Sequence, residues 1–286
     1  PYHHHHHPQL DRLIIELQLS GEHAYQTLQR VVESVNVVAQ TYNDTALGDV
    51  HLSPLDGTVV LGSGLMKFGF TLRQFAAVYA SKFGVDTHRM TARLWGDWYF
   101  DTGSKRWSSD SKSATGKALE RAFSQFVWQP MSNLMLAAMS GDWTSLDRML
   151  SGIKVSLSAD ERQLPGGRAL ATAVMRRWLP LSASLLDTMV MHLPSPATAQ
   201  RYRTELLYSG PQTDAVAAAM RDCRADGPLM VLVVGMVPST RPGRLFALGR
   251  VFSGIVHRRQ SVLVLGPAYT RGSRDLFRNC SVQSIV

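Results

Sequence analysis

Few residues in this sequence have types and spacings that could bind a metal or a phosphate. The histidine run His3–His7 could chelate a divalent cation, but flexible terminal ligands have no neighbours to hold them in a fixed geometry. We therefore interpret residues 1–8 as a tag-like or non-native edge rather than a physiological metal site. Gly62 and Gly64 follow the apolar run 58–61. Glycines after a strand can let the backbone approach a nucleotide, but two glycines alone indicate such a site only weakly.

Several common catalytic signatures are absent from the sequence. It contains no G-x-x-x-x-G-K-[S/T], no H-E-x-x-H and no G-x-S-x-G. The isolated histidines have no metal-ligand spacing and are interpreted as turn, surface or core residues; they are His51, His88, His192 and His257. The spacing of these motifs alone therefore does not identify an activity.

The elements that would position these residues are mainly helical over the first two hundred residues. From Ser20 to Tyr42 the apolar spacing predicts one helix. Its expected buried face consists of Tyr25, Leu28, Val31, Val32, Val35 and Val38. The segment 58–61 reads as a short buried strand that runs into the glycine-rich turn 62–65. This order of helix, strand, turn and helix is typical of an α/β sheet.

Local signals fix where some helices begin and end. Thr71 and Gln74 form a predicted capping box, and Phe70 and Phe75 occupy the positions of a hydrophobic staple. A second capping box, Ser158 with Glu161, opens a later helix. A helix over 181–193 is expected to bury an inner face and to stop at the proline-rich run 193–196. That face consists of Leu185, Leu186, Met189, Val190 and Leu193.

The sequence changes to strands after Gly227. Apolar runs over 229–234, 245–251 and 262–266 alternate with proline and glycine turns, and they predict an antiparallel sheet or barrel. The aromatic run 94–100 lacks the alternating exposure of an RNA-stacking platform, so we expect Trp95, Trp98, Tyr99 and Phe100 to pack in the core. We place the domain boundary near residues 203–226.

Composition bounds the class of protein. With 286 residues the chain has room for roughly two domains. Its 45% hydrophobic residues exclude overall disorder, and no apolar run reaches the roughly 18 residues of a membrane span. Two cysteines, Cys223 and Cys280, are too few for a disulfide framework and suit a reducing compartment. The 30 basic against 22 acidic residues give a charge of +8, which favours an anionic partner.

Several longer motifs occur in a fixed order along almost the whole chain. They are Leu61–Leu65, Phe70–Ala76, Arg93–Asp97, Ala173–Pro180, His192–Pro196, Met236–Pro238, Gly249–Gly254 and Gly266–Pro267. In sequence and spacing this series resembles the eukaryotic and archaeal elongation factor 2 family of translational GTPases. The match extends over about residues 11–282.

The resemblance implies an α/β fold in two parts. Residues 9–206 would be the C-terminal part of a P-loop-type G domain with a helical insert, and residues 207–286 the start of an incomplete antiparallel β-barrel. In the family, an aspartate and a strand-end loop read the guanine base. These roles fall on Asp11 and on Gly62, Ser63, Gly64 and Leu65, but Pro8 and Gln9 replace the asparagine and lysine of the aspartate motif.

The same resemblance implies cofactors and partners. GTP and Mg²⁺ would belong to the parent protein, whose P-loop, switches and catalytic histidine are expected upstream, so we expect no GTP hydrolysis by this chain alone. The expected partner is the ribosome, through rRNA and stalk proteins, for a cytoplasmic monomer without a membrane partner. The candidate rRNA contacts are Arg241, Arg244, Arg258 and Arg259, although Arg259 stands where the family usually has a turn glycine. If that turn requires a positive φ, Arg259 strains it.

Other interpretations stay open at this point. The chain also resembles, less closely, a spliceosomal GTPase that acts as a scaffold in RNP remodelling and a ribosome-assembly GTPase. The damaged aspartate motif favours a non-catalytic rRNA-binding remnant. Finally, each arginine cluster could simply be a solvated face; the further clusters are Arg176–Arg177 and Arg201 with Arg203.

Overall fold

The computed structural model describes residues 9–41, 51–113, 116–239, 243–267, 269 and 275–285. Their contacts divide the chain into two compact units, unit 1 (Pro1–Leu193) and unit 2 (Pro194–Val286), which are described separately. The division lies ahead of the 206/207 boundary expected from sequence. The reason is that helix α9 (Pro196–Leu207) packs against α10 (Ala215–Arg221) and so belongs with unit 2.

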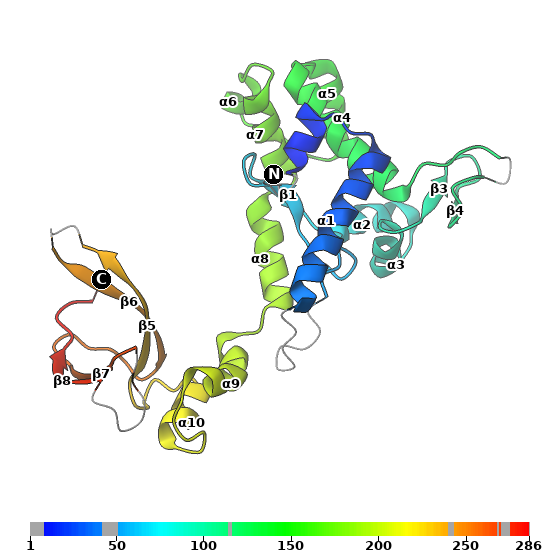
Figure 1. Ribbon diagram of the computed structural model, residues 1–286. Helices are drawn as coiled ribbons and strands as arrows, with labels where there is room; N and C mark the ends of the chain where they lie inside the picture. The colour runs from blue at the N-terminus through cyan, green and yellow to red at the C-terminus, as the bar shows by residue number, and fades with distance from the viewer. Residues whose placement is uncertain are drawn as a thin grey trace, which may run out of the picture. The chain divides into compact units, whose positions relative to one another are not determined.

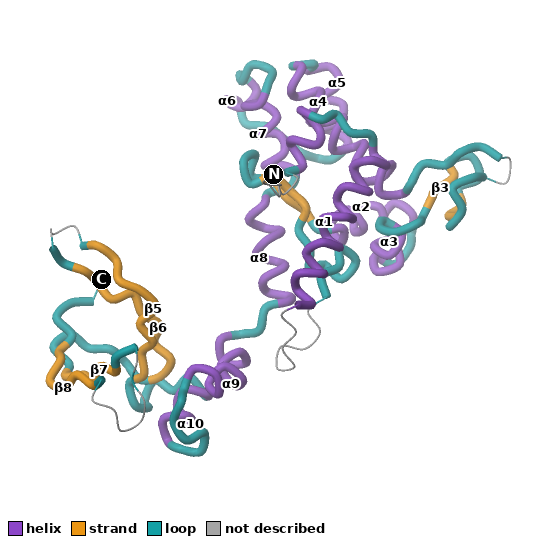
Figure 2. Tube along the Cα trace, viewed as in Figure 1, coloured by secondary structure: helices purple, strands orange, loops and turns teal. Residues whose placement is uncertain are grey.

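Unit 1 is mostly helical, with two small hairpins (Figures 1 and 2). Its helices are the π-helices η1 (Arg12–Glu16) and η2 (Ser124–Trp128), together with α1 (Gly21–Thr41), α2 (Leu72–Phe83), α3 (Thr87–Arg93), α4 (Gln129–Ser140), α5 (Trp143–Gly152), α6 (Ala159–Arg162), α7 (Arg168–Trp178) and α8 (Leu181–His192). Its strands are β1 (Leu61–Ser63), β2 (Phe68–Phe70), β3 (Tyr99–Asp101) and β4 (Arg106–Ser108). None of the helices described in either unit is both long and apolar enough to cross a membrane.

The core of unit 1 joins helices with the β1–β2 hairpin. Its largest fully buried side chains include Phe68, Phe70, Phe123 and Met131. The aromatic run packs as expected: Trp95 meets the Phe123 ring at 5.4 Å between centroids, and Trp95, Trp98 and Phe100 all lie against the core. Tyr99 is half-buried, with its hydroxyl 3.4 Å from Arg121 Nη2. The prediction of core packing is therefore confirmed for Trp95, Trp98 and Phe100, which lie half-buried against the core, whereas Tyr99 contacts Arg121.

The predicted start of α2 is also found. Gln74 Oε1 accepts a hydrogen bond from the Thr71 backbone N–H at 3.2 Å. The staple residues Phe70 and Phe75 contact each other edge-to-face, with 4.8 Å between centroids. The Ser158–Glu161 capping box likewise opens α6. These features need only neighbours three to five residues apart, which is why the sequence reveals them.

Two predicted apolar faces are less buried than expected. In α1, Tyr25 and Leu28 are buried, but Val35 and Val38 are exposed. The inner face predicted for α8 is wrong as well: Ser184 is the buried residue of this helix, and Val190 is 80% exposed. Helical spacing shows which residues share a face but not how much of that face another element covers.

The strand predicted at 58–61 is displaced and pairs differently. β1 begins only at Leu61 and forms an antiparallel hairpin with β2, in which Gly62 lies opposite Gly69. A Cβ atom on Gly62 would lie 2.7 Å from the Gly69 Cα, so this close pairing requires glycine. The loop at Ser63 therefore joins two strands and not a strand to a helix. Ser184 Oγ, at the start of α8, donates to the Gly69 carbonyl at 2.7 Å and fixes the helix on the hairpin.

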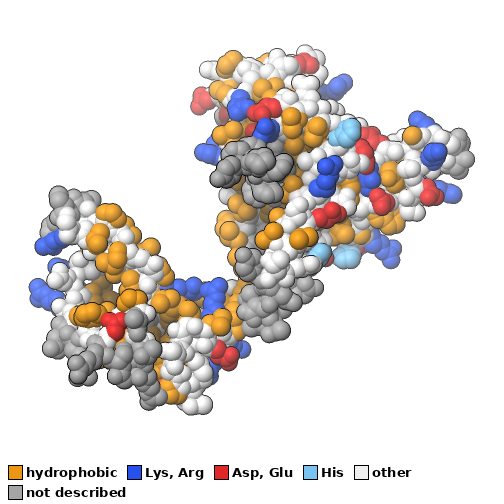
Figure 3. Space-filling view, viewed as in Figure 1, with side chains coloured by type: hydrophobic (Ala, Val, Ile, Leu, Met, Phe, Trp, Pro, Cys, Tyr) orange, Lys and Arg blue, Asp and Glu red, His pale blue; other side chains and the backbone are white. Residues whose placement is uncertain are grey.

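Unit 2 contains α9, α10 and two antiparallel hairpins. The hairpins pair β5 (Met230–Pro238) with β6 (Leu245–Ser253), and β7 (Ser261–Leu265) with β8 (Leu276–Ser281). Among the described residues these hairpins remain separate two-stranded sheets and do not close into a barrel. β5, expected to be a buried strand, exposes most of its apolar residues, and hydrophobic side chains lie on the visible surface of this hairpin (Figure 3). Overall, the described chain mixes helices with small antiparallel sheets.

Candidate functional site

Asp11 lies directly before the π-helix η1, in a tight turn. The Gln9 carbonyl accepts from the backbone N–H groups of Arg12 and Leu13, at 3.0 and 3.2 Å. Leu10 and Leu13 on either side are buried in the core and fix the turn. Asp11 itself is only 3% exposed, and its Oδ1 atom has no hydrogen-bond partner among the described residues. A buried acceptor without a donor is costly, so this carboxylate is a candidate for a ligand N–H.

The glycine-rich loop forms the corner of the β1–β2 hairpin. Ser63 is buried, and its Oγ accepts from the Met66 backbone N–H at 3.1 Å, which tightens the turn. Gly64 has open space around it, and Leu65 is 59% exposed. The backbone N–H groups of Gly64 and Leu65 donate to no carbonyl elsewhere in the described chain. These two N–H groups are thus available to an acceptor from outside.

The structure brings the two sequence segments close together. Leu10, next to Asp11, lines the same cavity of about 150 Å³ as Leu61 and Gly62. The remaining wall is apolar and consists of Leu28, Val31, Val32, Val59 and Val60. The cavity reaches neither Gly64 nor Leu65, and Asp11 does not line it. The segments are therefore neighbours, but the five predicted residues do not surround one common space.

Two kinds of group at these segments match hydrogen-bonding groups of a guanine base in chemical type. The free oxygen of Asp11 is suited to accept from a base N–H, and the N–H groups of Gly64 and Leu65 to donate to a carbonyl. However, the Oδ1 atom is buried, so a base could reach it only if the surrounding side chains moved. Within the described ranges, no three His, Cys, Asp or Glu residues are grouped so as to hold a metal ion. The match to a guanine nucleotide is thus limited to Asp11 and to the N–H groups of Gly64 and Leu65, which could contact only the base.

The basic candidates that the structure describes lie next to the start of β6 and in the turn between β6 and β7. Arg244 is exposed beside the first residue of β6, where its carbonyl accepts from Ser239 N–H at 2.9 Å. Arg258 and Arg259 are exposed in the turn that precedes β7. Arg241 lies outside the described residues. Arg244 and the Arg258–Arg259 pair therefore present positive charge to solvent from separate turns.

The turn at 257–260 holds its arginines in a defined conformation. Gln260 N–H donates to the His257 carbonyl at 3.2 Å, and Arg259 N–H to the Val282 carbonyl at 2.7 Å. Arg259 has a φ of +65°, the left-handed conformation that favours glycine. The expected strain at Arg259 is thus present. Its side chain is aimed outward from a turn that two backbone hydrogen bonds fix.

The arginines of α7 are engaged differently. Arg177 Nε lies 3.1 Å from Glu161 Oε1, and Arg176 Nη2 lies 3.8 Å from the same oxygen. The hydrogen bond from Ser158 N–H and the contact with Arg177 lower the pKa of the Glu161 carboxyl. This cluster is therefore an ion-pair surface of unit 1 and a weaker candidate for phosphate.

Sequence reasoning missed one polar centre in unit 1. Arg121 is buried, with its guanidinium 2.8 Å from both Glu22 Oε2 and Asp97 Oδ1 and 4.2 Å from the centroid of the Tyr25 ring. The hydrogen bond from Arg121 lowers the pKa of Glu22. All contacts of Arg121 are internal, so its role is to tie α1 to the segments before β3 and η2. The available signal was the charged pair Glu120–Arg121 between the apolar residues Leu119 and Phe123.

Comparison with protein-family models finds no family that matches this chain.

Proposed function

We propose that this chain is a segment of a ribosome-associated GTPase of the elongation factor 2 type, which promotes GTP-dependent translocation in protein synthesis. In this proposal unit 1 carries the guanine-reading side of the nucleotide site, and unit 2 contacts small-subunit rRNA. The basis is the ordered series of motifs from Leu61 to Pro267. The GTPase activity is assigned to a longer protein, because this sequence has no phosphate-binding loop motif.

The observation that carries the proposal is the proximity of two distant segments. Leu10 and Gly62 are separated along the chain by all of α1 but line one cavity. A site that reads guanine through both Asp11 and the Gly62–Leu65 loop requires this proximity. The free Oδ1 atom of Asp11 and the free N–H groups of Gly64 and Leu65 supply an acceptor and donors of the required kinds.

The chemistry assigned to these residues is recognition and not bond breaking. The Asp11 carboxylate would accept from the base N–H groups, and the N–H groups of Gly64 and Leu65 would donate to the guanine carbonyl. Bound GTP would supply the phosphoryl group whose transfer drives the conformational cycle of the whole protein. Because the motif has Pro8 and Gln9 in place of asparagine and lysine, base binding is expected to be weaker than in the family.

The rRNA contacts are assigned to Arg244, Arg258 and Arg259. All three are exposed, and the turn around Arg258 and Arg259 is fixed by backbone hydrogen bonds. Arginine side chains on fixed turns can pair with phosphates without reading sequence. Such binding releases counterions and therefore weakens steeply as salt is raised.

A second candidate function is supported by a specific observation. The burial of Asp11, together with Pro8 and Gln9, favours a non-catalytic rRNA-binding protein that retains the arginine contacts without a working guanine site. This candidate shares the ribosome as partner. It differs in that its binding would not respond to GTP, whether or not the missing phosphate-binding parts are supplied.

Co-sedimentation with purified ribosomes tests the shared part of the proposal. The chain is expected to pellet with ribosomes at about 50 mM salt and to lose most of this binding by about 200 mM. The double variant Arg258→Glu/Arg259→Glu should bind at least about tenfold more weakly, because two attractive charges become repulsive. The matched control Arg73→Glu/Arg89→Glu reverses two exposed arginines of unit 1 and should bind like the natural chain. Equal binding of the 258/259 variant at low salt would overturn the assignment.

A further inference from the structure

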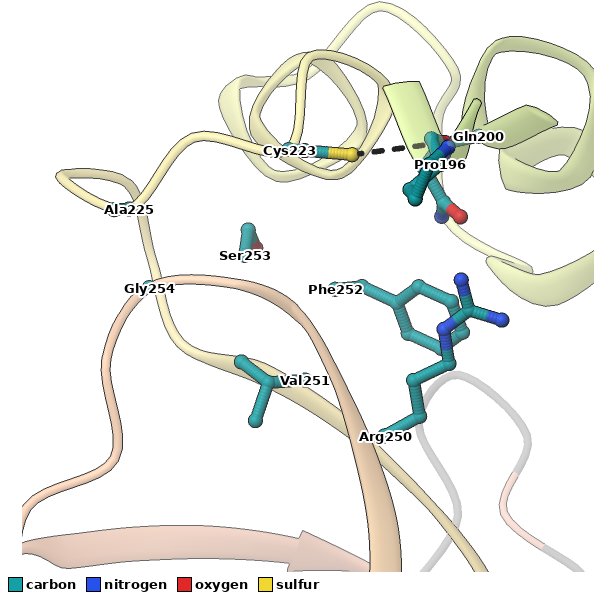
Figure 4. Close-up of a pocket in the computed structure, with 9 residues that line it drawn as sticks. All are labelled: Pro196, Gln200, Cys223, Ala225, Arg250, Val251, Phe252, Ser253 and Gly254. Carbon is teal, nitrogen blue, oxygen red and sulfur yellow. Dashed lines mark hydrogen bonds between the residues drawn. The ribbon is translucent and has the colours of Figure 1, made fainter. Parts of the chain in front are cut away.

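Unit 2 contains a cavity that plays no part in the proposed nucleotide or rRNA contacts. Its volume is about 220 Å³, and it lies between the start of α9, the segment after α10 and the end of β6 (Figure 4). It is lined by Pro196, Gln200, Cys223, Ala225, Arg250 and the run Val251–Gly254. Three elements distant in sequence thus enclose a space that combines apolar walls with polar side chains.

Gln200 supplies the clearest sign that a ligand is needed here. The residue is only 1% exposed, and its Nε2 atom has no hydrogen-bond partner among the described residues. Figure 4 shows its amide group directed toward the Phe252 ring and the Arg250 guanidinium. A buried N–H₂ group is energetically unfavourable unless a hydrogen-bond acceptor lies next to it. An oxygen atom placed in this cavity would do so.

Arg250 adds a positive charge next to this amide. Its guanidinium carbon lies 5.4 Å from the centroid of the Phe252 ring, which orients it along the cavity wall. No ion pair among the described residues involves Arg250. The carboxylate of Asp226, which follows the lining residue Ala225 in the sequence, is held by Arg224 in a two-pronged pair, at 3.1 and 2.8 Å. The charge of Arg250 is therefore not neutralised from within this part of the molecule.

The apolar residues of the cavity wall indicate that the ligand also has an apolar part. Phe252 is largely buried and offers a ring face, and Val251 and Ala225 extend the apolar wall. One guanidinium matches one negative charge, whereas a phosphate dianion would leave charge unbalanced in a partly apolar space. Planar carboxylates suit the two-pronged geometry of arginine.

We propose that this cavity binds a small organic monocarboxylate with an apolar body. Arg250 and the Gln200 Nε2 group donate to the carboxylate oxygens, and the apolar body lies against Phe252 and Val251. This assignment does not depend on the ribosomal function, because the arginines of the 257–260 turn do not line the cavity.

Cys223 provides a direct reporter of occupancy. Its exposed thiol lines the cavity, with Sγ 4.0 Å from the Pro196 carbonyl. In a Cys280→Ser background, Cys223 is the remaining cysteine of the chain. We measure its alkylation rate by iodoacetamide with increasing benzoate, using neutral benzamide as the matched probe. Benzoate is expected to slow alkylation in a saturable way, and benzamide at the same concentration is expected not to.

Two variants of the full chain assign the contacts. Arg250→Gln should weaken protection by benzoate at least about tenfold, because it removes a charge-assisted hydrogen bond. Arg203→Gln, an exposed arginine of α9 outside the cavity, should leave protection unchanged. Circular dichroism with and without benzoate verifies that each variant is folded. If Arg250→Gln is unfolded, Gln200→Leu is used in its place and should likewise weaken protection.

Three outcomes would overturn the proposal. Absence of protection at about 10 mM benzoate would show that the cavity does not bind a carboxylate at relevant strength. Equal protection by benzamide would show an apolar pocket without charge selection. Protection that persists in folded Arg250→Gln would place the carboxylate elsewhere.

Discussion

The arginine side chains that the structure describes lie in two different environments, one paired with carboxylates and one not. Arg121 is surrounded by its partners Glu22, Asp97 and Tyr25, so its charge stabilises unit 1. Arg258 and Arg259 present theirs to solvent from a fixed turn. Arg250 lines a cavity without a carboxylate partner among the described residues. The same residue type thus has a structural role in one unit and candidate binding roles in the other.

The Glu22–Arg121 pair predicts how stability changes with pH. Because Arg121 lowers the pKa of Glu22 in the folded chain, the pair stabilises the fold fully above the ordinary pKa of 4.5. This stabilisation disappears as the pH falls through the lowered pKa of the folded state. We expect the stability difference between the natural chain and Glu22→Gln, measured by urea unfolding, to be constant above about pH 5 and to shrink below it.

The matched control for this measurement is Glu33→Gln, an exposed residue of α1 whose carboxylate accepts from Gln29 and, among the described residues, forms no ion pair. Its difference from the natural chain should stay nearly flat over the same pH range. A Glu22→Gln difference that grows toward low pH would contradict the sign of the Arg121 effect.

The strain at Arg259 leads to a second prediction at this scale. Since its φ is +65°, Arg259→Gly relieves a left-handed conformation and should raise the free energy of unfolding of unit 2 by about 0.5–1 kcal/mol. Arg258 does not have a positive φ, so Arg258→Gly should lower stability or leave it unchanged. Thermal or urea unfolding of the two variants checks that Arg259→Gly is more stable than Arg258→Gly. Stabilisation by Arg258→Gly but not by Arg259→Gly would contradict the turn geometry.

At the scale of elements, local signals and long-range contacts differ in what a sequence reveals. The start of α2 follows from Thr71, Gln74 and Phe75 within one turn, and the stop of α8 follows from Pro194. The pairing of β1 with β2, and the proximity of Leu10 to Gly62, depend on contacts that no local pattern encodes. Strand β8 was not anticipated, and neither was the exposure of α8.

The exposure of α8 can be tested by a charge placed on its apolar face. Val190 is 80% exposed, so Val190→Lys should change the free energy of unfolding by less than about 0.5 kcal/mol. Leu170→Ala, at a fully buried position of α7, should cost about 2–5 kcal/mol and serves as the reference for a core residue. Urea unfolding gives both values. A loss of several kcal/mol in Val190→Lys would show that this face is packed in solution.

At the scale of the whole molecule, composition predicted the number of parts but little about how its charges are used. Length and hydrophobic content allowed two domains, and two units are found, with their division at Leu193 and Pro194. The +8 charge pointed to an anionic partner but not to which arginines would contact it. Arg121 and Arg177 contribute to that charge yet are held by carboxylates, whereas Arg258 and Arg259 pair with no carboxylate in the part of the chain that the structure describes. Only the side-chain environment separates these groups.

The candidate guanine site and the cavity of unit 2 differ in how far the sequence could reveal them. The residues proposed to read guanine lie in two neighbouring segments of unit 1 but around no single space, because Asp11 is buried and Gly64 is open. The motifs led us to expect that the segments of Asp11 and Gly62 lie close together, but they could not reveal that the Asp11 carboxylate is buried. The cavity of Gln200 and Arg250 had no sequence signal, because its residues come from separate elements of unit 2.

We propose above all that unit 2 contacts small-subunit rRNA through Arg258 and Arg259. Hydroxyl-radical footprinting of rRNA in intact ribosomes, at low salt and saturating chain, tests it most directly. We predict discrete protections in the small-subunit rRNA that disappear with Arg258→Glu/Arg259→Glu and persist with Arg73→Glu/Arg89→Glu. Absence of any protection, or protections that the 258/259 variant retains in full, would contradict the claim.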